Sequence, residues 1–136
     1  MSNISEATLN DLIAKATEAS KNAYCRYSTF RVGAAVLTDT GDVYTGCNVE
    51  NASYGLTICA ERNAIFHMVV QARQKIVALV IYTPKPKPAS PCGACRQVIN
   101  EFGPEARVIT VCDSPARIDT TLDKLLPGAF GPANLP

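Results

Sequence analysis

Three cysteines and one glutamate have the types and spacing of a zinc site that does chemistry. Cys92 and Cys95 form a CxxC pair, whose two sulfurs can reach one ion, and Cys59 can supply a third thiolate. A zinc ion with three protein ligands keeps its fourth position for water. Glu61 lies two residues after Cys59 and adds the base that hydrolytic zinc chemistry needs. Together these residues predict a catalytic zinc site.

A structural zinc site and a thiol redox site are the alternatives that the same cysteines allow. A CxxC pair alone occurs in each of these kinds of site. A structural zinc site usually has four protein ligands, often in two CxxC-like pairs, and this sequence has no second pair. The lack of a fourth ligand and the presence of Glu61 favour catalysis over a structural zinc module in a binding protein.

Hydrophobic periodicity predicts the helices that must position these residues. Apolar residues three and four apart predict helices over residues 5–24 and 60–74, and the second of these begins next to Cys59. Its expected buried stripe is Ala64, Ile65, Met68, Val69 and Ala72. A third helix over residues 93–102 begins within the CxxC pair. Because the N-terminal end of a helix carries a partial positive charge, both helix starts favour thiolates.

Strand patterns complete the prediction of an α/β fold. The predicted strands cover residues 30–36, 43–47, 76–82 and 107–112, with a short edge strand at Ile118. The first two form a hairpin, and the continuous apolar run 76–82 is typical of a central strand that is covered on both faces. Residues 83–90 contain three prolines and predict a stiff surface loop that leads to Cys92, and residues 121–126 predict a last helical turn or two. Strands alternating with helices indicate a layered α/β sheet.

Composition and charge favour a small ligand over a polynucleotide. The chain has 136 residues, a formal net charge of +1 and 18% charged residues, so it offers no basic field for a phosphate backbone. We predict a single domain over residues 1–136, without a membrane span, because no apolar run reaches roughly 20 residues. With no signal peptide pattern, we predict a cytoplasmic location.

The six cysteines are expected to be free or metal-bound thiols. A chain of this size without a secretion signal is expected in a reducing compartment, where three disulfides would not form. Cys25, Cys47 and Cys112 have no partner at motif spacing. We therefore predict that these three are small, buried apolar residues.

Five stretches of the sequence form a specific pattern. They are Cys59-Ala60-Glu61, Pro91-Cys92-Gly93-Ala94-Cys95, and residues 30–35, 46–55 and 125–131. The first two resemble the CxE and PCxxC signature of the zinc-dependent cytidine deaminases. The other three resemble the small homotetrameric nucleoside branch of that family, so the resemblance covers nearly the whole chain. One departure is Cys25-Arg26, which precedes Tyr27 where relatives commonly have a proline.

The resemblance implies a fold and a reaction. The fold is a cytidine deaminase-like three-layer α/β/α sandwich with a mixed, mostly five-stranded sheet. The reaction is hydrolytic deamination of cytidine and deoxycytidine to uridine and deoxyuridine with release of ammonia, as in pyrimidine salvage. One zinc ion per subunit, held by Cys59, Cys92 and Cys95, would provide the hydroxide that attacks C4, and Glu61 would act as the proton shuttle to N3. Deaminases of polynucleotides or of an aminocytosine antibiotic are alternatives within the same chemistry.

The resemblance also implies which residues bind the nucleoside. It assigns Asn48 and Glu50 to the ribose hydroxyls, which an amide and a carboxylate can bind by donating and accepting hydrogen bonds. It assigns Phe30 to stacking on the base and the backbone N–H of Ala60 to the base O2. Residues 48–58 form a polar loop that leads into the zinc motif, and such loops often carry binding groups.

Other residues are implied at subunit interfaces and beside the metal. In the homotetrameric family the positions of Ala52, Tyr54 and Phe130 contribute to a neighbouring subunit's site. The alternative for Phe130 is that it fixes the Pro/Gly-rich tail to its own core. Zinc with three thiolates has a formal charge of −1, and Arg62 and Arg96, each next in sequence to a site residue, are candidates to offset it by donating hydrogen bonds to sulfur.

Overall fold

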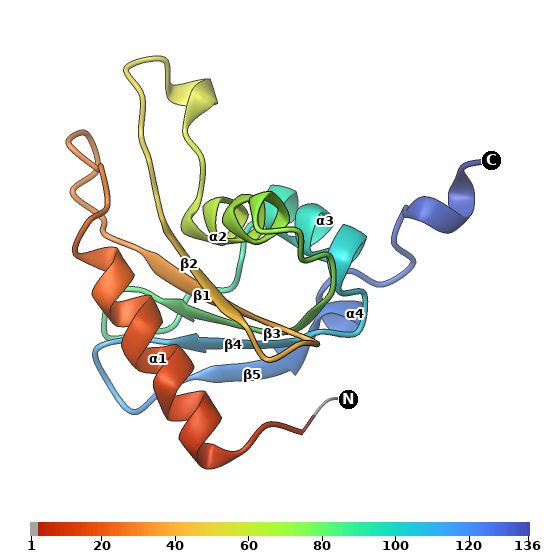
Figure 1. The fold of residues 1–136 in the computed structure, drawn as a ribbon. Coiled ribbons are helices and arrows are strands. Elements are labelled where there is room, and N and C mark those ends of the chain that lie inside the picture. Colours follow the sequence, from red (N-terminus) through yellow and green to blue (C-terminus); the bar gives the residue numbers. More distant parts are fainter. Residues whose placement is uncertain (1–2) are drawn as a thin grey trace.

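The computed structural model describes residues 3–136, which form one sheet with helices on both sides (Figure 1). The elements in chain order are α1 (Glu6–Ser20), β1 (Gly33–Thr38), β2 (Val43–Cys47), α2 (Ala60–Val70), β3 (Ile76–Tyr82), α3 (Gly93–Phe102), β4 (Arg107–Val111), β5 (Ile118–Thr121) and α4 (Leu122–Leu125). Two short 3-10 turns lie at Tyr54–Leu56 and Pro132–Asn134. Every predicted helix and strand is present, with shifts at its ends.

The five strands form a single mixed sheet in the order β2-β1-β3-β4-β5. The pair β3 and β4 is parallel, because α3 connects them as a crossover helix, and the other three pairs are antiparallel. The central strand β3 is the continuous apolar run, and most of its residues are buried. The predicted mixed five-stranded sheet is therefore confirmed.

Helices cover the two faces of the sheet and make three layers, as Figure 1 shows. Leu12 and Ala16 of α1 pack with Val80 of β3 on one face. On the other face, Ile65 of α2 and Ile99 of α3 belong to a separate buried cluster that also contains Leu79, Ile81 and Val108. Successive β-strand residues point to opposite faces, so each strand feeds both clusters. The predicted α/β/α sandwich is confirmed.

Two glycines let the helices approach the sheet closely. A Cβ atom at Gly33 of β1 would lie 1.8 Å from the carbonyl oxygen of Ala16 in α1. A Cβ atom at Gly46 of β2 would lie 2.3 Å from the backbone nitrogen of Ala64 in α2. These contacts are too short for any side chain, so α1 and α2 lie directly on the strand backbones. The second contact fixes the depth of α2, which begins next to Cys59.

The first two helices are shorter than the sequence pattern predicts. Helix α1 ends at Ser20, and the guanidinium of Arg31 donates hydrogen bonds to the carbonyl oxygens of Lys21 and Ala23 beyond that end. Helix α2 ends at Val70, and Ala72 has a left-handed backbone with φ of 62°. Ala64, Ile65 and Met68 are buried as predicted, but Val69 is 40% exposed and Ala72 is also exposed. Their predicted burial was wrong: Ala72 lies beyond the end of the helix, and Val69 lies in its last turn on the side that faces solvent.

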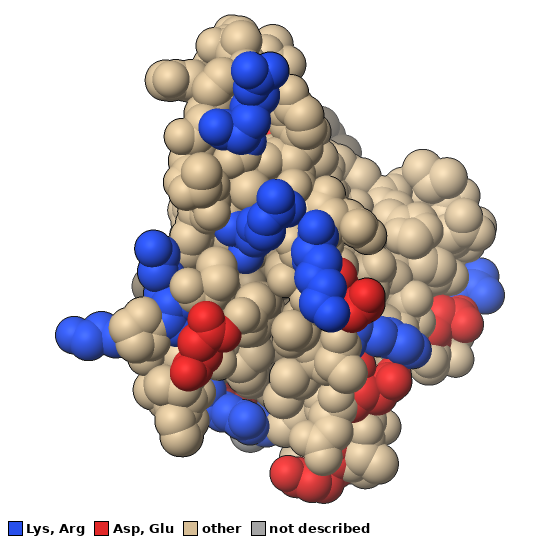
Figure 2. Space-filling model, turned by 90° about the vertical axis from the view of Figure 1, so that its left-hand side faces the viewer, with Lys and Arg blue, Asp and Glu red and all other residues tan. Residues whose placement is uncertain are grey.

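Charged side chains do not join into a basic stripe on the face shown in Figure 2. Lys and Arg side chains form separate groups from the upper to the lower part of this face, and Asp and Glu side chains stand among them in its lower half. A groove that follows a phosphate backbone needs a continuous run of positive charge. Among residues 3–136, no helix combines the length and apolar character that crossing a bilayer requires.

Candidate metal centre and active site

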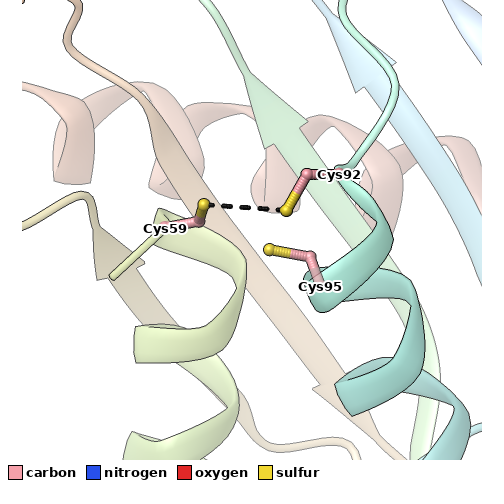
Figure 3. A group of neighbouring side chains, drawn as sticks. All are labelled: Cys59, Cys92 and Cys95. Atoms are coloured by element: carbon pink, nitrogen blue, oxygen red, sulfur yellow. Dashed lines mark hydrogen bonds between the residues drawn. The ribbon is translucent and has the colours of Figure 1, made fainter. Parts of the chain in front are cut away.

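The starts of two helices bring the three predicted thiol ligands together (Figure 3). Cys59 is the N-cap residue of α2 and Cys92 is the N-cap residue of α3, while Cys95 lies in the first turn of α3. The Cys59 and Cys92 sulfurs are 3.9 Å apart, and all three sulfurs lie within 4.8 Å of one another. Tetrahedral zinc with Zn–S bonds of about 2.3 Å separates its sulfurs by about 3.8 Å. The donor set therefore fits a zinc ion.

Electrostatics at this cluster favour deprotonation of Cys59. Hydrogen bonds from the Cys95 thiol, from Arg62 and from the Cys92 thiol lower the pKa of Cys59 to about 5 against the effect of burial. The same contact with Cys59, together with burial, raises the pKa of Cys95. These shifts favour the thiolate at Cys59 and the protonated thiol at Cys95. Zinc binding requires all three to be thiolates and releases that proton.

The two arginines beside the cluster differ in what they contact. Arg62 Nη2 lies 3.5 Å from the Cys59 sulfur, as predicted for a donor to a metal-bound thiolate. Its buried Nε has no hydrogen-bond partner among the described residues. Arg96 instead donates to the carbonyl oxygens of Pro91 and Leu125 and to the Ser90 hydroxyl. Arg96 therefore ties the loop before Cys92 to the end of α4 and makes no hydrogen bond to sulfur within residues 3–136.

Glu61 is a buried acid beside the thiol cluster. Its side chain belongs to the first turn of α2 and only 6% of the residue is exposed. Burial is the main cause that raises its pKa to about 7, and the charge of Cys59 adds to it. A pKa near neutrality suits a group that must accept a proton and then release it. A bound Zn²⁺ would oppose this shift, because a nearby cation stabilises the carboxylate.

A cavity of about 360 Å³ opens beside Glu61 and joins most of the predicted site residues. Its lining includes Cys59, Glu61 and Cys92 together with Phe30, Asn48, Glu50 and Ala60. A cavity of about 670 Å³ lies elsewhere, between the start of α1 and the turn after β1, and none of the predicted site residues lines it. The smaller cavity is the candidate active site because, of the two, it alone is lined by thiols of the cluster, Cys59 and Cys92, and by the acid Glu61.

The three residues predicted to act across an interface lie outside this cavity. Ala52 is exposed, and Tyr54 is 74% exposed with its ring edge-to-face against that of Tyr27 at 5.8 Å. Phe130 is 59% exposed. Its carbonyl oxygen accepts hydrogen bonds from Gln97 Nε2 at 2.8 Å and from Asn100 Nδ2 at 3.3 Å. The tail is thus held through its backbone, and the Phe130 ring is left outside the core.

Sequence reasoning missed three residues beside the cavity. Ser28 lines it and contacts Glu50, and the Lys85 ammonium lies 5.6 Å from the centre of the Phe30 ring. Thr83, just after β3, is only 2% exposed, and its hydroxyl oxygen has no protein partner in the described part of the chain. A buried hydroxyl in a cavity wall can hydrogen-bond a ligand. The position of Thr83 directly after a buried strand could have indicated a site residue, whereas no sequence feature marks Ser28 or Lys85 as one.

The remaining cysteines lie outside the metal cluster. Cys25 is buried, with 4% of the residue exposed, as predicted. Cys47 and Cys112 are only partly buried, so the prediction of full burial was wrong for these two. Burial is the main cause that raises the pKa of Cys47. None of the six cysteines is in a disulfide, which agrees with the prediction of free or metal-bound thiols.

Comparison with known proteins agrees with this geometry. The family described as the cytidine and deoxycytidylate deaminase zinc-binding region matches residues 6–112. The chain belongs to this family. The matched region contains the three clustered cysteines and Glu61, so zinc is the metal that the cluster binds.

Relatives of this deaminase family match over most of their length. A cytidine deaminase of Sporosarcina psychrophila is 45% identical over 125 residues, which cover 91% of this chain and 92% of the relative. A probable cytidine deaminase of Dictyostelium discoideum is 41% identical over 97% of this chain and 90% of the relative. The crystal structure of cytidine deaminase from Burkholderia pseudomallei superposes with a TM-score of 0.87 at 41% identity, covering 93% of this chain and all of that one (100%).

Loss of Arg62 should make zinc binding more sensitive to acid. Arg62 lowers the pKa of Cys59, so Arg62→Gln raises that pKa, and protons compete for the sulfur at a higher pH. As pH falls, the midpoint of zinc release from Arg62→Gln should come at a higher pH than in the parent. A chromogenic chelator measures the released zinc. Arg107→Gln is the control, because Arg107 pairs with Asp119 and does not touch the cluster, and its midpoint should match the parent's. Equal midpoints of zinc release for Arg62→Gln and the parent would show that Arg62 does not stabilise the Cys59 thiolate.

Proposed function

We propose that this protein deaminates cytidine and deoxycytidine by hydrolysis, giving uridine or deoxyuridine and ammonia, as a step of pyrimidine salvage. One observation carries the proposal. Three thiols lie within 4.8 Å of one another, and two of them, Cys59 and Cys92, line one cavity together with the buried Glu61 and groups suited to a nucleoside. Thiol redox chemistry does not need the buried acid, and a structural zinc site does not need the cavity.

Glu61 moves the protons of the reaction. Zinc held by the three cysteines would act as a Lewis acid that activates a water molecule for attack on the cytosine ring. The Glu61 carboxylate takes one proton from the attacking water and delivers it to N3 while oxygen bonds to C4. The second proton of the water goes to the exocyclic nitrogen, the C4–N bond breaks, and ammonia leaves with C4 as a carbonyl. The position of Glu61 in the first turn of α2 keeps it beside the metal throughout.

Asn48 and Glu50 bind the sugar in this proposal. The Asn48 amide already holds the chain before β1, because Oδ1 accepts from the Val32 N–H at 2.9 Å and Nδ2 donates to the Phe30 carbonyl at 2.8 Å. A second N–H of the amide remains for a sugar oxygen. The Phe30 ring and the backbone N–H of Ala60 line the same cavity and are proposed to contact the base. A free sugar hydroxyl at Glu50 distinguishes a nucleoside from a polynucleotide, in which the 3′ oxygen is esterified.

Turnover of purified, zinc-loaded protein tests the proposed function. The decrease in ultraviolet absorbance that accompanies conversion of cytidine to uridine should be observed, with one ammonia released per cytidine consumed. A single-stranded oligonucleotide that contains cytosine serves as the competing substrate. Conversion of the oligonucleotide but not of cytidine would contradict the nucleoside assignment. No conversion of either substrate by protein with full zinc content would contradict deamination itself.

A homotetramer with active sites at subunit interfaces is the second part of the proposal. It is supported by exposed aromatic and aliphatic side chains on several elements, which include Tyr54, Leu56, Val70, Phe130 and Leu135. Such side chains together suit burial against other subunits. We infer that Ala52, Tyr54 and Phe130 reach a neighbour's cavity in this assembly. A cytoplasmic location stays a prediction.

Mixed tetramers should reveal whether Phe130 acts in a neighbouring site. A base has two faces, so Phe30 of one subunit and Phe130 of another can enclose it, and each stacking contact contributes roughly 1 to 3 kcal/mol. Glu61→Ala should be nearly inactive, and Phe130→Ala should lose about 5- to 150-fold in kcat/KM. Refolded together, they should regain turnover, because some sites then combine an intact Glu61 with a neighbour's intact Phe130. Hybrids whose composition is verified by native mass spectrometry but which show no recovery would contradict action in trans.

A further inference from the structure

The chain before β1 makes a tight turn over residues 25–29. The Thr29 N–H donates to the Cys25 carbonyl oxygen at 2.7 Å, and Thr29 has a left-handed backbone with φ of 58°. A threonine rarely adopts this conformation, since its branched side chain crowds the backbone there. Surrounding contacts must therefore hold the turn, which leads directly into Phe30.

The Ser28 hydroxyl provides two of those contacts at once. It donates a hydrogen bond to Glu50 Oε2, and it accepts a hydrogen bond from the Phe30 N–H at 3.0 Å. Glu50 Oε1 accepts from the backbone N–H groups of Tyr27 at 2.9 Å and Ser28 at 3.1 Å. The Ser28 side chain thus connects the Glu50 carboxylate, which is proposed to bind the sugar, with the backbone of Phe30, whose ring is proposed to stack on the base.

These contacts decide what Glu50 can still bind. An ionised carboxylate has about four acceptor positions, and three of those on Glu50 are filled by the turn. The Ser28 hydroxyl is the main cause that lowers the pKa of Glu50, which keeps it ionised and therefore an acceptor only. One acceptor position remains, on Oε2. Glu50 can therefore accept a hydrogen bond from one hydroxyl group of a ligand.

We propose that Ser28 is a positioning residue that aims Glu50 at one ribose hydroxyl and fixes Phe30 beside the base. This proposal rests on the proposed nucleoside function and adds a residue to it. Because Ser28 acts on ground-state binding of the sugar, and its hydrogen bonds go to Glu50, Thr29 and Phe30 rather than to the thiols or Glu61, its loss should change KM and leave kcat nearly constant.

The test compares Ser28→Ala with the parent on two nucleosides. On cytidine we expect KM to rise about tenfold, as for loss of one hydrogen bond to a charged group, with kcat within about twofold of the parent. On 2′,3′-dideoxycytidine, which lacks the hydroxyls that Glu50 could bind, the KM ratio of variant to parent should be clearly smaller. Ser28→Thr keeps the hydroxyl and should restore the parent KM on cytidine. Ser28→Cys retains a weak donor and should fall between parent and alanine variant, which keeps the test available should Ser28→Ala not fold.

Two results would overturn the proposal. Unchanged KM on cytidine in both Ser28→Ala and Ser28→Cys would show that the hydroxyl does not position the sugar site. Equal losses on cytidine and dideoxycytidine, accompanied by a fall in kcat, would show a general structural role in the turn. Parent protein that does not turn over cytidine would reject the proposed function instead, so the two failures are distinct.

Discussion

Replacing Glu61 by glutamine should leave zinc bound and almost abolish deamination. An amide of the same shape cannot take the proton of the attacking water and cannot return it to N3, so both proton transfers lose their carrier. General acid and base catalysis contributes about 10²- to 10⁴-fold per group, and Glu61 serves in both directions, so we expect kcat to fall about a thousandfold or more. The burial of Glu61 also means that solvent water cannot easily replace it as the base.

The measurement pairs turnover with zinc content. Glu61 lies beside the thiol cluster but its carboxylate is not one of the three clustered donors, so elemental analysis of Glu61→Gln should still give one zinc per chain. Glu101→Gln is the control because Glu101 is an exposed residue of α3, and it should keep parental kcat and zinc content. A kcat above about a tenth of the parent's in zinc-replete Glu61→Gln would refute the assignment of Glu61 as proton shuttle.

The parts of the site that the sequence predicted are those in which short-range spacing determines geometry. Cys92 and Cys95 are three positions apart at a helix start, so their sulfurs must lie close together once α3 forms. Cys59 at the start of α2 is a long-range partner, and its approach to the other two depends on both helices lying on the same face of the sheet. The alternation of strands and helices predicted a layered α/β sheet, whereas the family resemblance supplied the mixed sheet and the three-layer order.

Other parts could not be predicted because they depend on where a flexible side chain finds its partners. Arg96 is next to Cys95 in sequence, yet backbone carbonyls of Pro91 and Leu125 offer its guanidinium closer acceptors than the sulfurs do. Ser28 is an exposed serine in a loop, and only the three-dimensional turn places its hydroxyl between Glu50 and Phe30. Neither the Arg96 contacts nor the Ser28 contacts are indicated by a periodic pattern or a motif in the sequence.

The same structure explains why one chain can hold most of the site but leave it open. Phe30, Asn48, Glu50 and Glu61 converge because β1, the loop after β2 and the start of α2 meet at one end of the sheet. Phe130 follows the last helix, and its carbonyl is bound by α3, so its ring is directed to the outside. A single subunit therefore supplies the chemistry and one face of the base pocket, while closure of the pocket is left to another chain in the proposed assembly.

Removal of either thiol of the CxxC pair should eliminate zinc and activity together. A three-ligand site has no spare protein donor, so Cys92→Ala and Cys95→Ala each leave two thiolates and a weak site. We expect zinc content below about a tenth of an equivalent after dialysis and deamination reduced by at least about a thousandfold. In the parent, added zinc should raise Tm because the metal binds the folded chain, and this dependence should vanish in both variants.

Burial predicts a difference between the two variants in stability. Cys95 is fully buried with 0% exposed, so its truncation leaves a cavity and should lower the Tm of the metal-free protein, whereas Cys92 is exposed and its loss should not. Cys112→Ala is the matched control. The Cys112 thiol contacts the Ser114 hydroxyl and the Ala116 carbonyl oxygen, and it is not one of the three clustered thiols. This variant should retain one zinc and parental turnover. Parental zinc content in Cys92→Ala and Cys95→Ala would mean that the metal is held by a different set of donors.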